Sequence, residues 1–117
     1  MTEDPTPEAL RARFAPLLQA ELAELRAQST DTSADRAPVT LDQQSVGRLS
    51  RMDAMQAQSM ATAMEQRRKN RIARIQDALR RLEADDFGYC DDCGAFIGEG
   101  RLAVDPIVRR CISCAGR

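Results

Sequence analysis

The sequence predicts an all-α protein: an antiparallel helical hairpin of the coiled-coil type, followed by a small C-terminal four-cysteine zinc-finger node. First, only 3% of the residues are aromatic and 30% are charged, which is typical of long helices and not of a broad globular core. Second, apolar residues recur at steps of three and four in two long segments. Third, all four cysteines lie close together near the C-terminus. We therefore expect a hairpin over residues 1–86, with a tip loop near 29–48, and a node over residues 87–117.

The first helix is predicted to begin at Pro7. Thr6 has the side chain of an N-cap, proline is favoured at the first helical position, and Glu8 suits the positive end of the helix dipole. The apolar stripe that follows consists of Leu10, Phe14, Leu17, Leu18, Leu22 and Leu25. So narrow a stripe predicts a helix of about six turns that packs against a second helix. The small, polar residues 29–40 are expected to form a loop.

The second helix is predicted to run without interruption from Leu49 to Asp86, since this segment contains neither proline nor glycine. The helix is expected to start before or close to this uninterrupted segment. A capping box favours a start at Thr40, and Ser45 and Ser50 are alternative starts. Its predicted seam is Ile72, Ile75, Leu79 and Leu82, extended backwards by Arg68, Met64, Ala61, Ala57 and Val46. Gly88 is expected to take the left-handed position that ends the helix.

The cysteines form two Cys-x-x-Cys pairs, Cys90 with Cys93 and Cys111 with Cys114, separated by 17 residues. This spacing is typical of a four-thiolate zinc site, in which Zn²⁺ is tetrahedral with bonds of about 2.3 Å. The alternatives are two disulfides, a redox-active pair, or an iron site of the same geometry. The lack of a secretory leader argues against disulfides, and the lack of a βαβ context argues against a thioredoxin-like motif. Four thiolates leave no open position, so we expect one structural zinc.

The charges are distributed unevenly along the chain although the net charge is only -1. Residues 67–81 hold one acid, Asp77, and seven basic residues: Arg67, Arg68, Lys69, Arg71, Arg74, Arg80 and Arg81. Residues 1–42 hold eight acids and four arginines. This asymmetry indicates a directed interaction surface and not a general affinity for nucleic acid.

The sequence also disfavours catalysis and membrane insertion. Histidine is absent, as are the glycine-rich phosphate and dinucleotide motifs and the serine nucleophile elbow, so we do not expect an enzyme. No apolar run approaches the roughly 20 residues of a membrane span. We therefore expect a soluble, cytoplasmic protein that does not associate with membranes. We also expect it to be a monomer.

Arg67, Arg71, Arg74 and Arg81 share one side of the second predicted helix, about a quarter turn from the seam. Two interpretations are open. One is a solvated helix face with intrahelical pairs such as Arg74 with Asp77. The other is a contact surface for an acidic protein or a phosphorylated small molecule. The methionines Met52, Met55, Met60 and Met64 are interpreted as packing residues, with a recognition surface as the alternative.

A helical hairpin that leads through DDFGYCDDCG to CISCAGR resembles the DksA/TraR family of zinc-finger transcription factors. The resemblance is closest from Ala84 to Cys114 and includes Gly94, Ile97, Gly98, Arg101, Leu102 and Pro106. It implies a protein that enters the secondary channel of bacterial RNA polymerase, with its tip near the catalytic centre and without sequence-specific DNA contacts. It also implies a role in the stringent response and a purely structural zinc.

The resemblance also indicates which residues form the tip of the hairpin. The family's tip has two aspartates three residues apart and an alanine two residues later, which in an ungapped register fall on Gly47, Ser50 and Met52; the nearby acids are Asp42 and Asp53. Binding in the channel is expected to remain while the transcriptional effect is altered or lost.

The family's alarmone, guanosine tetraphosphate, lies between hairpin and polymerase. Its basic contact positions correspond to Arg67 and Arg74, whereas Arg71 replaces an apolar residue and Asp105 a basic one. Participation of the alarmone is therefore left open.

Two functions of other classes remain as alternatives. A zinc-ribbon protein that binds nucleic acid is disfavoured because the node is neutral: Arg101, Arg109, Arg110 and Arg117 are balanced by Asp91, Asp92, Glu99 and Asp105. A thiol-based redox sensor would use the same four cysteines.

Overall fold

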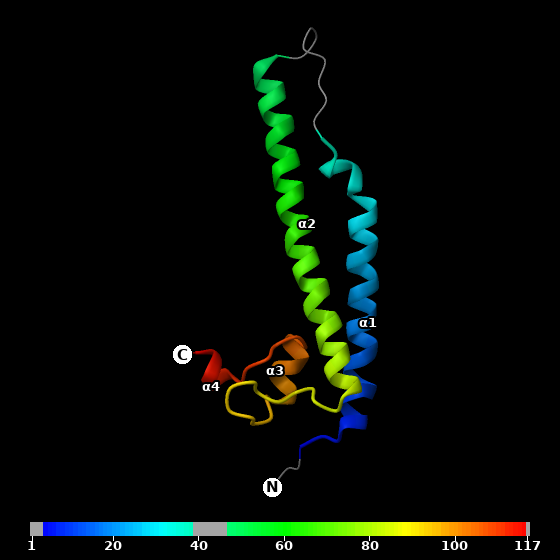
Figure 1. The fold of residues 1–117 in the computed structure, drawn as a ribbon, viewed down its shortest axis with the longest axis vertical. Coiled ribbons are helices and arrows are strands. Elements are labelled where there is room, and N and C mark those ends of the chain that lie inside the picture. The colour runs from blue at the N-terminus through cyan, green and yellow to red at the C-terminus, as the bar shows by residue number, and fades with distance from the viewer. Residues whose placement is uncertain (1–3, 39–46, 117) are drawn as a thin grey trace. The chain divides into compact units, whose positions relative to one another are not determined.

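The structure, a computed structural model, describes residues 4–38 and 47–116. Its elements are α1 (Pro7–Asp31), the 3-10 helix η1 (Ser33–Arg36), α2 (Arg48–Glu83), α3 (Glu99–Val104) and α4 (Ile112–Ala115) (Figure 1). Within the described ranges, β pairing is limited to one antiparallel bridge between Tyr89 and Phe96. The predicted all-α fold, with two paired helices and a four-cysteine node, is confirmed.

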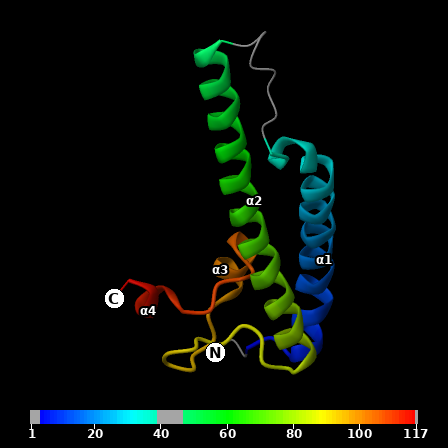
Figure 2. The same cartoon turned by 45° about the horizontal axis from the view of Figure 1, so that its top comes forward.

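The chain divides into two compact units. Unit 1 consists of residues 1–22 and 73–117, and unit 2 of residues 23–72. Within each unit a segment of α1 lies beside an antiparallel segment of α2 (Figures 1 and 2). The node belongs to unit 1, and the predicted domain boundary between residues 86 and 87 stays a prediction.

Unit 1 has an apolar core to which both helices and the node contribute. From the helices it buries Leu10, Phe14, Leu18, Ile75, Ala78 and Leu82, and from the node Phe87, Cys90, Ile97, Leu102, Ile107 and Cys114. The rings of Phe14 and Phe87 lie 5.4 Å apart and join α1 to the start of the node. The node thus supplies half of the buried hydrophobic residues of unit 1.

The predicted stripe on α1 is confirmed at Leu10, Phe14 and Leu18, which follow each other at every fourth residue. Leu17, also predicted in the stripe, is 55% exposed. That prediction is wrong because Leu17 lies about 100° from Leu18 around the helix, outside the face that α1 buries. The N-cap is confirmed: the backbone N–H of Ala9 donates to Oγ1 of Thr6 at 3.1 Å.

The predicted seam on α2 is confirmed at Ile75 and Leu82, whereas Leu79 is half-buried and Ala78 is fully buried beside them. Its backward extension is confirmed at Arg68, whose side chain is only 10% exposed, and is wrong at Ala57 and Met64. Met64 is 50% exposed, and the residue buried in its place is Glu65. Val46 lies outside the described residues.

The loop and helix starts differ in part from the prediction. α1 continues to Asp31, past the predicted loop start at Ser29. α2 begins at Arg48, so the alternative start at Ser50 is wrong. Thr40 and Ser45, the other predicted starts, lie outside the described residues.

Asp85, and not Gly88, takes the left-handed position that ends α2, with a φ of 59°. The N–H of Asp86 donates to the carbonyl of Arg81 at 2.8 Å, and that of Asp85 to the carbonyl of Leu82 at 3.3 Å, which is the Schellman pattern. Aspartate tolerates this conformation better than most residues, and Arg11 of α1 pairs with its carboxylate. Gly88 lies in the turn that follows and has a φ of 95°. A Cβ at this position would lie 3.1 Å from the ring of Phe96.

Candidate metal centre and basic groove

The first cysteine pair lies in a tight turn. The N–H of Cys90 donates to the carbonyl of Ala95 at 2.8 Å, and that of Gly94 donates to the carbonyl of Cys90 at 2.9 Å. Gly94 has a φ of 76°, a conformation that glycine adopts without steric cost. The turn points the sulfurs of Cys90 and Cys93 toward the same side.

The second cysteine pair lies at the start of helix α4, which also brings its two sulfurs to one side. Cys111 is the residue before α4, and the N–H of Ala115 donates to its carbonyl at 2.8 Å. Cys114 therefore follows Cys111 after nearly one helical turn and lies on the same face.

The four sulfurs of Cys90, Cys93, Cys111 and Cys114 all lie within 4.8 Å of one another, and none forms a disulfide. The sulfurs of Cys93 and Cys111, one from each pair, are 3.7 Å apart. A tetrahedron with metal–sulfur bonds of about 2.3 Å has edges of about 3.8 Å, so the donor set fits a single Zn²⁺. All four predicted ligands are brought together.

The surroundings of the four thiols shift their pKa values in opposite directions. The backbone N–H of Cys111 stabilises the Cys90 thiolate and lowers the pKa of Cys90 to about 6. The N–H of Cys114 lowers the pKa of Cys111 in the same way. The N–H of Ala95 favours the Cys93 thiolate, but the neighbouring sulfurs of Cys90 and Cys111 outweigh it and raise the pKa of Cys93.

The sulfurs of Cys111 and Cys90 raise the pKa of Cys114 to about 12. The protein by itself thus stabilises two thiolates and opposes the other two. A divalent metal supplies the positive charge that four adjacent thiolates need.

The predicted basic strip is divided between the units. Arg67 is exposed and Arg71 half-buried in unit 2, whereas Arg74 is exposed in unit 1. The predicted pair of Arg74 with Asp77 does not form, because Asp77 pairs instead with Arg80, Arg81 and Arg109.

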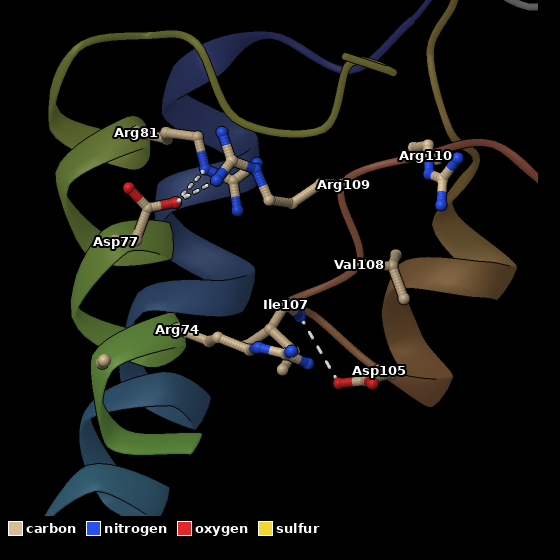
Figure 3. Close-up of a pocket in the computed structure, with 9 residues that line it drawn as sticks. Arg74, Asp77, Arg81, Asp105, Ile107, Val108, Arg109 and Arg110 are labelled. Atoms are coloured by element: carbon tan, nitrogen blue, oxygen red, sulfur yellow. Dashed lines mark hydrogen bonds and ion pairs between the residues drawn. The ribbon is translucent and has the colours of Figure 1, made fainter. Parts of the chain in front are cut away.

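Arg74 lines a groove of about 560 Å³ in unit 1, between α2 and the segment that leads to the second cysteine pair (Figure 3). The other lining residues are Ala73, Asp77, Arg81, Asp105, Ile107, Val108, Arg109 and Arg110. The side chain of Arg81 is only 11% exposed and its guanidinium lies 5.9 Å from the centre of the Phe87 ring. Its Nη2 is buried without a hydrogen-bond partner.

The predicted tip residues Gly47, Ser50, Met52 and Asp53 are all exposed, and Asp42 lies outside the described residues. Met52, Met55, Met60 and Met64 are each at least half exposed, so their interpretation as packing residues is wrong. Met60 and Met64 border an apolar groove of about 610 Å³ in unit 2, which also includes Ala37, Pro38 and Ala57.

Arg109 and Arg110 enter the sequence-based predictions only through their charge, which balances the acids of the node. They pair with Asp91 and Asp92, the two residues between the first cysteines. The sequence does contain a pattern that predicts these ion pairs. Two acids lie between the cysteines of the first pair, and two arginines directly precede the second pair.

No helix in the described part of the chain is both long and apolar enough to cross a membrane.

Residues 85–117 match the prokaryotic DksA/TraR C4-type zinc finger. The chain is 44% identical over 48 residues to the RNA polymerase-binding transcription factor DksA of Haemophilus influenzae, which covers 41% of this chain and 33% of that protein. It is 39% identical over 62 residues to DksA of Escherichia coli K12, covering 50% of this chain and 41% of that protein. The matched part thus spans less than half the length of these curated relatives.

The structure of transcription factor DksA2 from Pseudomonas aeruginosa matches with a TM-score of 0.70 and 21% identity. The match covers 95% of this chain and 81% of that one, so the two proteins share the fold. The four sulfurs and the matched finger imply one structural zinc, and over its zinc finger the chain is similar to proteins of the DksA/TraR family.

Proposed function

We propose that this chain is a transcription regulator that binds bacterial RNA polymerase in the cytoplasm, as a monomer, with its hairpin tip in the secondary channel near the active centre. The observation that carries the proposal is the match of the zinc finger to relatives named for RNA polymerase binding, together with a fold shared with DksA2 over 95% of the chain. Its role is to bind and not to catalyse, since four sulfurs fill the coordination sphere of a zinc ion.

The deciding experiment is a competition between two partners. The zinc-loaded protein is mixed with core RNA polymerase and with duplex DNA at the same salt concentration, and its co-migration with each is measured. We expect a complex with polymerase and none with DNA, because Asp91 and Asp92 offset Arg109 and Arg110 in the node. Binding to DNA alone would favour the zinc-ribbon alternative.

The arginines Arg67, Arg71 and Arg74 are proposed to form charge-assisted contacts with polymerase. Changing Arg67 and Arg74 together to glutamate should weaken the complex and reduce its dependence on salt. A matched control changes the exposed Arg26 and Arg80 to glutamate, with the same change in net charge. Equal losses from both double variants would mean that only net charge matters, which contradicts a specific contact.

A second candidate ligand is guanosine tetraphosphate in the groove of unit 1. Arg74 favours a polyphosphate there, and Asp77 and Asp105 in the same wall oppose it. In vitro transcription with and without the alarmone tests this, using Arg74→Ala as the variant. An alarmone response that Arg74→Ala leaves intact would exclude this groove.

The tip is proposed to alter the transcriptional effect without determining affinity. Gly47→Asp combined with Ser50→Asp places acids at positions that are exposed here, so the fold should tolerate them. We expect unchanged polymerase affinity and a transcriptional effect closer to that of acidic-tipped relatives. If the double change has no effect and the unmodified protein already acts like those relatives, the register is wrong, and Asp42 or Asp53 has that role.

A further inference from the structure

The two halves of the metal centre are joined by ion pairs as well as by their sulfurs. Nε of Arg109 lies 2.8 Å from Oδ2 of Asp91, and Nη1 of Arg110 lies 3.4 Å from Oδ2 of Asp92. The backbone N–H of Asp91 also donates to the carbonyl of Arg109 at 2.8 Å. Both cysteine pairs are therefore held side by side through contacts that involve no metal.

Arg109 has one contact that Arg110 lacks. Its Nη1 lies 3.6 Å from Oδ2 of Asp77, a residue of α2 that precedes the matched zinc finger. Figure 3 shows Arg81 and Arg109 converging on Asp77, with Arg110 well away from them. A single guanidinium thus bridges a carboxylate on α2 and a carboxylate next to the sulfur ligand Cys90.

We propose that Arg109 is a positioning residue for the metal centre, and that it ties retention of the metal to α2 through Asp77. Four sulfurs hold a metal tightly only if the second pair is kept at the correct distance from the first, and preorganised ligands lose less entropy on binding. The contact on Asp77 restrains Arg109, and Arg109 restrains Asp91. The proposal rests on the metal centre and not on polymerase binding, so it holds or fails independently of the proposed function.

The expected effect is moderate. The side chains of Arg109 and Asp91 are 55% and 43% exposed, and exposed ion pairs stabilise by at most about 1 kcal/mol each. Breaking the bridge should therefore lower zinc affinity about threefold to tenfold.

The test measures zinc affinity by competition with a chromogenic chelator. Arg109→Ala and Asp77→Asn should each lower the affinity, and the double variant should lose no more than the larger single effect because both changes break one bridge. Arg109→Lys keeps the charge but not the fork that reaches two carboxylates, so its affinity should be intermediate.

Two control variants isolate the bridge. Arg80→Ala removes another partner of Asp77 that does not touch the node, and should leave the affinity within twofold of the wild type. Arg110→Ala removes the parallel pair on Asp92, and its effect should be smaller than that of Arg109→Ala and additive with Asp77→Asn.

The proposal is overturned if Asp77→Asn leaves zinc affinity unchanged, or if its effect adds in full to that of Arg109→Ala. Asp77→Asn also removes the charged partner of Arg81, whose side chain is 11% exposed, so the fold of this variant is checked first by circular dichroism; an unfolded variant is set aside. In that case the comparison of Arg109→Gln with Arg110→Gln decides, since both leave Arg81 paired. Equal losses from these two variants overturn the proposal, and a larger loss from Arg109→Gln supports it.

Discussion

The two units are stabilised in different ways. Every buried hydrophobic residue in the described ranges belongs to unit 1, whereas the one buried charged residue, Glu65, belongs to unit 2. In unit 2 the carboxylate of Glu65 lies 2.8 Å from Arg36 and 3.2 Å from Arg68, and accepts a hydrogen bond from the hydroxyl of Ser29 at 2.5 Å. Unit 2 exposes its methionines instead of burying them.

The difference shows that paired helices need not be uniformly apolar along their length. Burial of apolar surface gives unit 1 most of its stability. A buried polar cluster adds little net stability, but its hydrogen bonds are satisfied in only one arrangement, so it selects a register. We infer that unit 1 supplies stability and that the Glu65 cluster sets how α1, η1 and α2 pair in unit 2.

Removing zinc should have the largest effect, and it should be concentrated in unit 1. Structural zinc contributes on the order of 10 kcal/mol to folding, and the node residues Phe87, Leu102 and Ile107 are part of the unit 1 core. Chelation should therefore abolish the slow hydrogen exchange of unit 1 amides. Unchanged exchange in unit 1 after complete removal of the metal would show that its core does not depend on the node.

Truncating the core of unit 1 should come next. Phe14→Ala removes a fully buried ring in contact with Phe87 and should cost about 3 to 5 kcal/mol in unfolding free energy. Leu17→Ala is the matched control on the same helix, and it should stay within about 0.5 kcal/mol because the side chain is exposed. Equal shifts in denaturant midpoint would mean that α1 buries a different face in solution.

Acid should act on unit 2 through Glu65. The hydrogen bond from Ser29, followed by the charges of Arg36, Arg68 and Lys69, holds the pKa of Glu65 below its ordinary value, although burial opposes this. The ionised carboxylate therefore stabilises the fold above the pKa of glutamate in the unfolded chain, and this contribution is lost as the pH falls through the lower folded pKa.

The measurement compares the wild type with Glu65→Gln in denaturant titrations at neutral and acidic pH. Release of zinc in acid affects both proteins and cancels in the difference. We expect the wild type to be the more stable at neutral pH and its advantage to shrink in acid. An advantage that does not change with pH would show that Glu65 is not ionised in the fold.

The smallest effect is expected at the exposed methionines of unit 2. Met60 is 61% exposed, and Met60→Gln preserves helix propensity, so unfolding free energy should change by no more than about 0.5 kcal/mol. The thermal midpoint of the variant provides the check. A shift as large as that of Phe14→Ala would mean that another surface covers this side chain in solution.

The sequence by itself determined the elements that local chemistry dictates. The N-cap at Thr6 and the buried positions Leu10, Phe14, Ile75 and Leu82 follow from side-chain type and helical period alone. The four cysteines indicate a metal site because two Cys-x-x-Cys pairs at this spacing have few uses other than to hold a metal.

Tertiary structure decided what depends on a partner distant in the chain. Glu65 is buried because Ser29 and Arg36 satisfy its carboxylate, while Met64, the more apolar residue beside it, faces outward. Asp85, and not Gly88, takes the left-handed position after α2, and its carboxylate pairs with Arg11 of α1, which is distant in the chain. Arg109 became part of the metal centre only when folding brought it to Asp77 and Asp91. The period of apolar residues predicts burial from the hydrophobicity of each side chain alone. The burial of a charged side chain depends instead on which polar groups contact it in the folded chain.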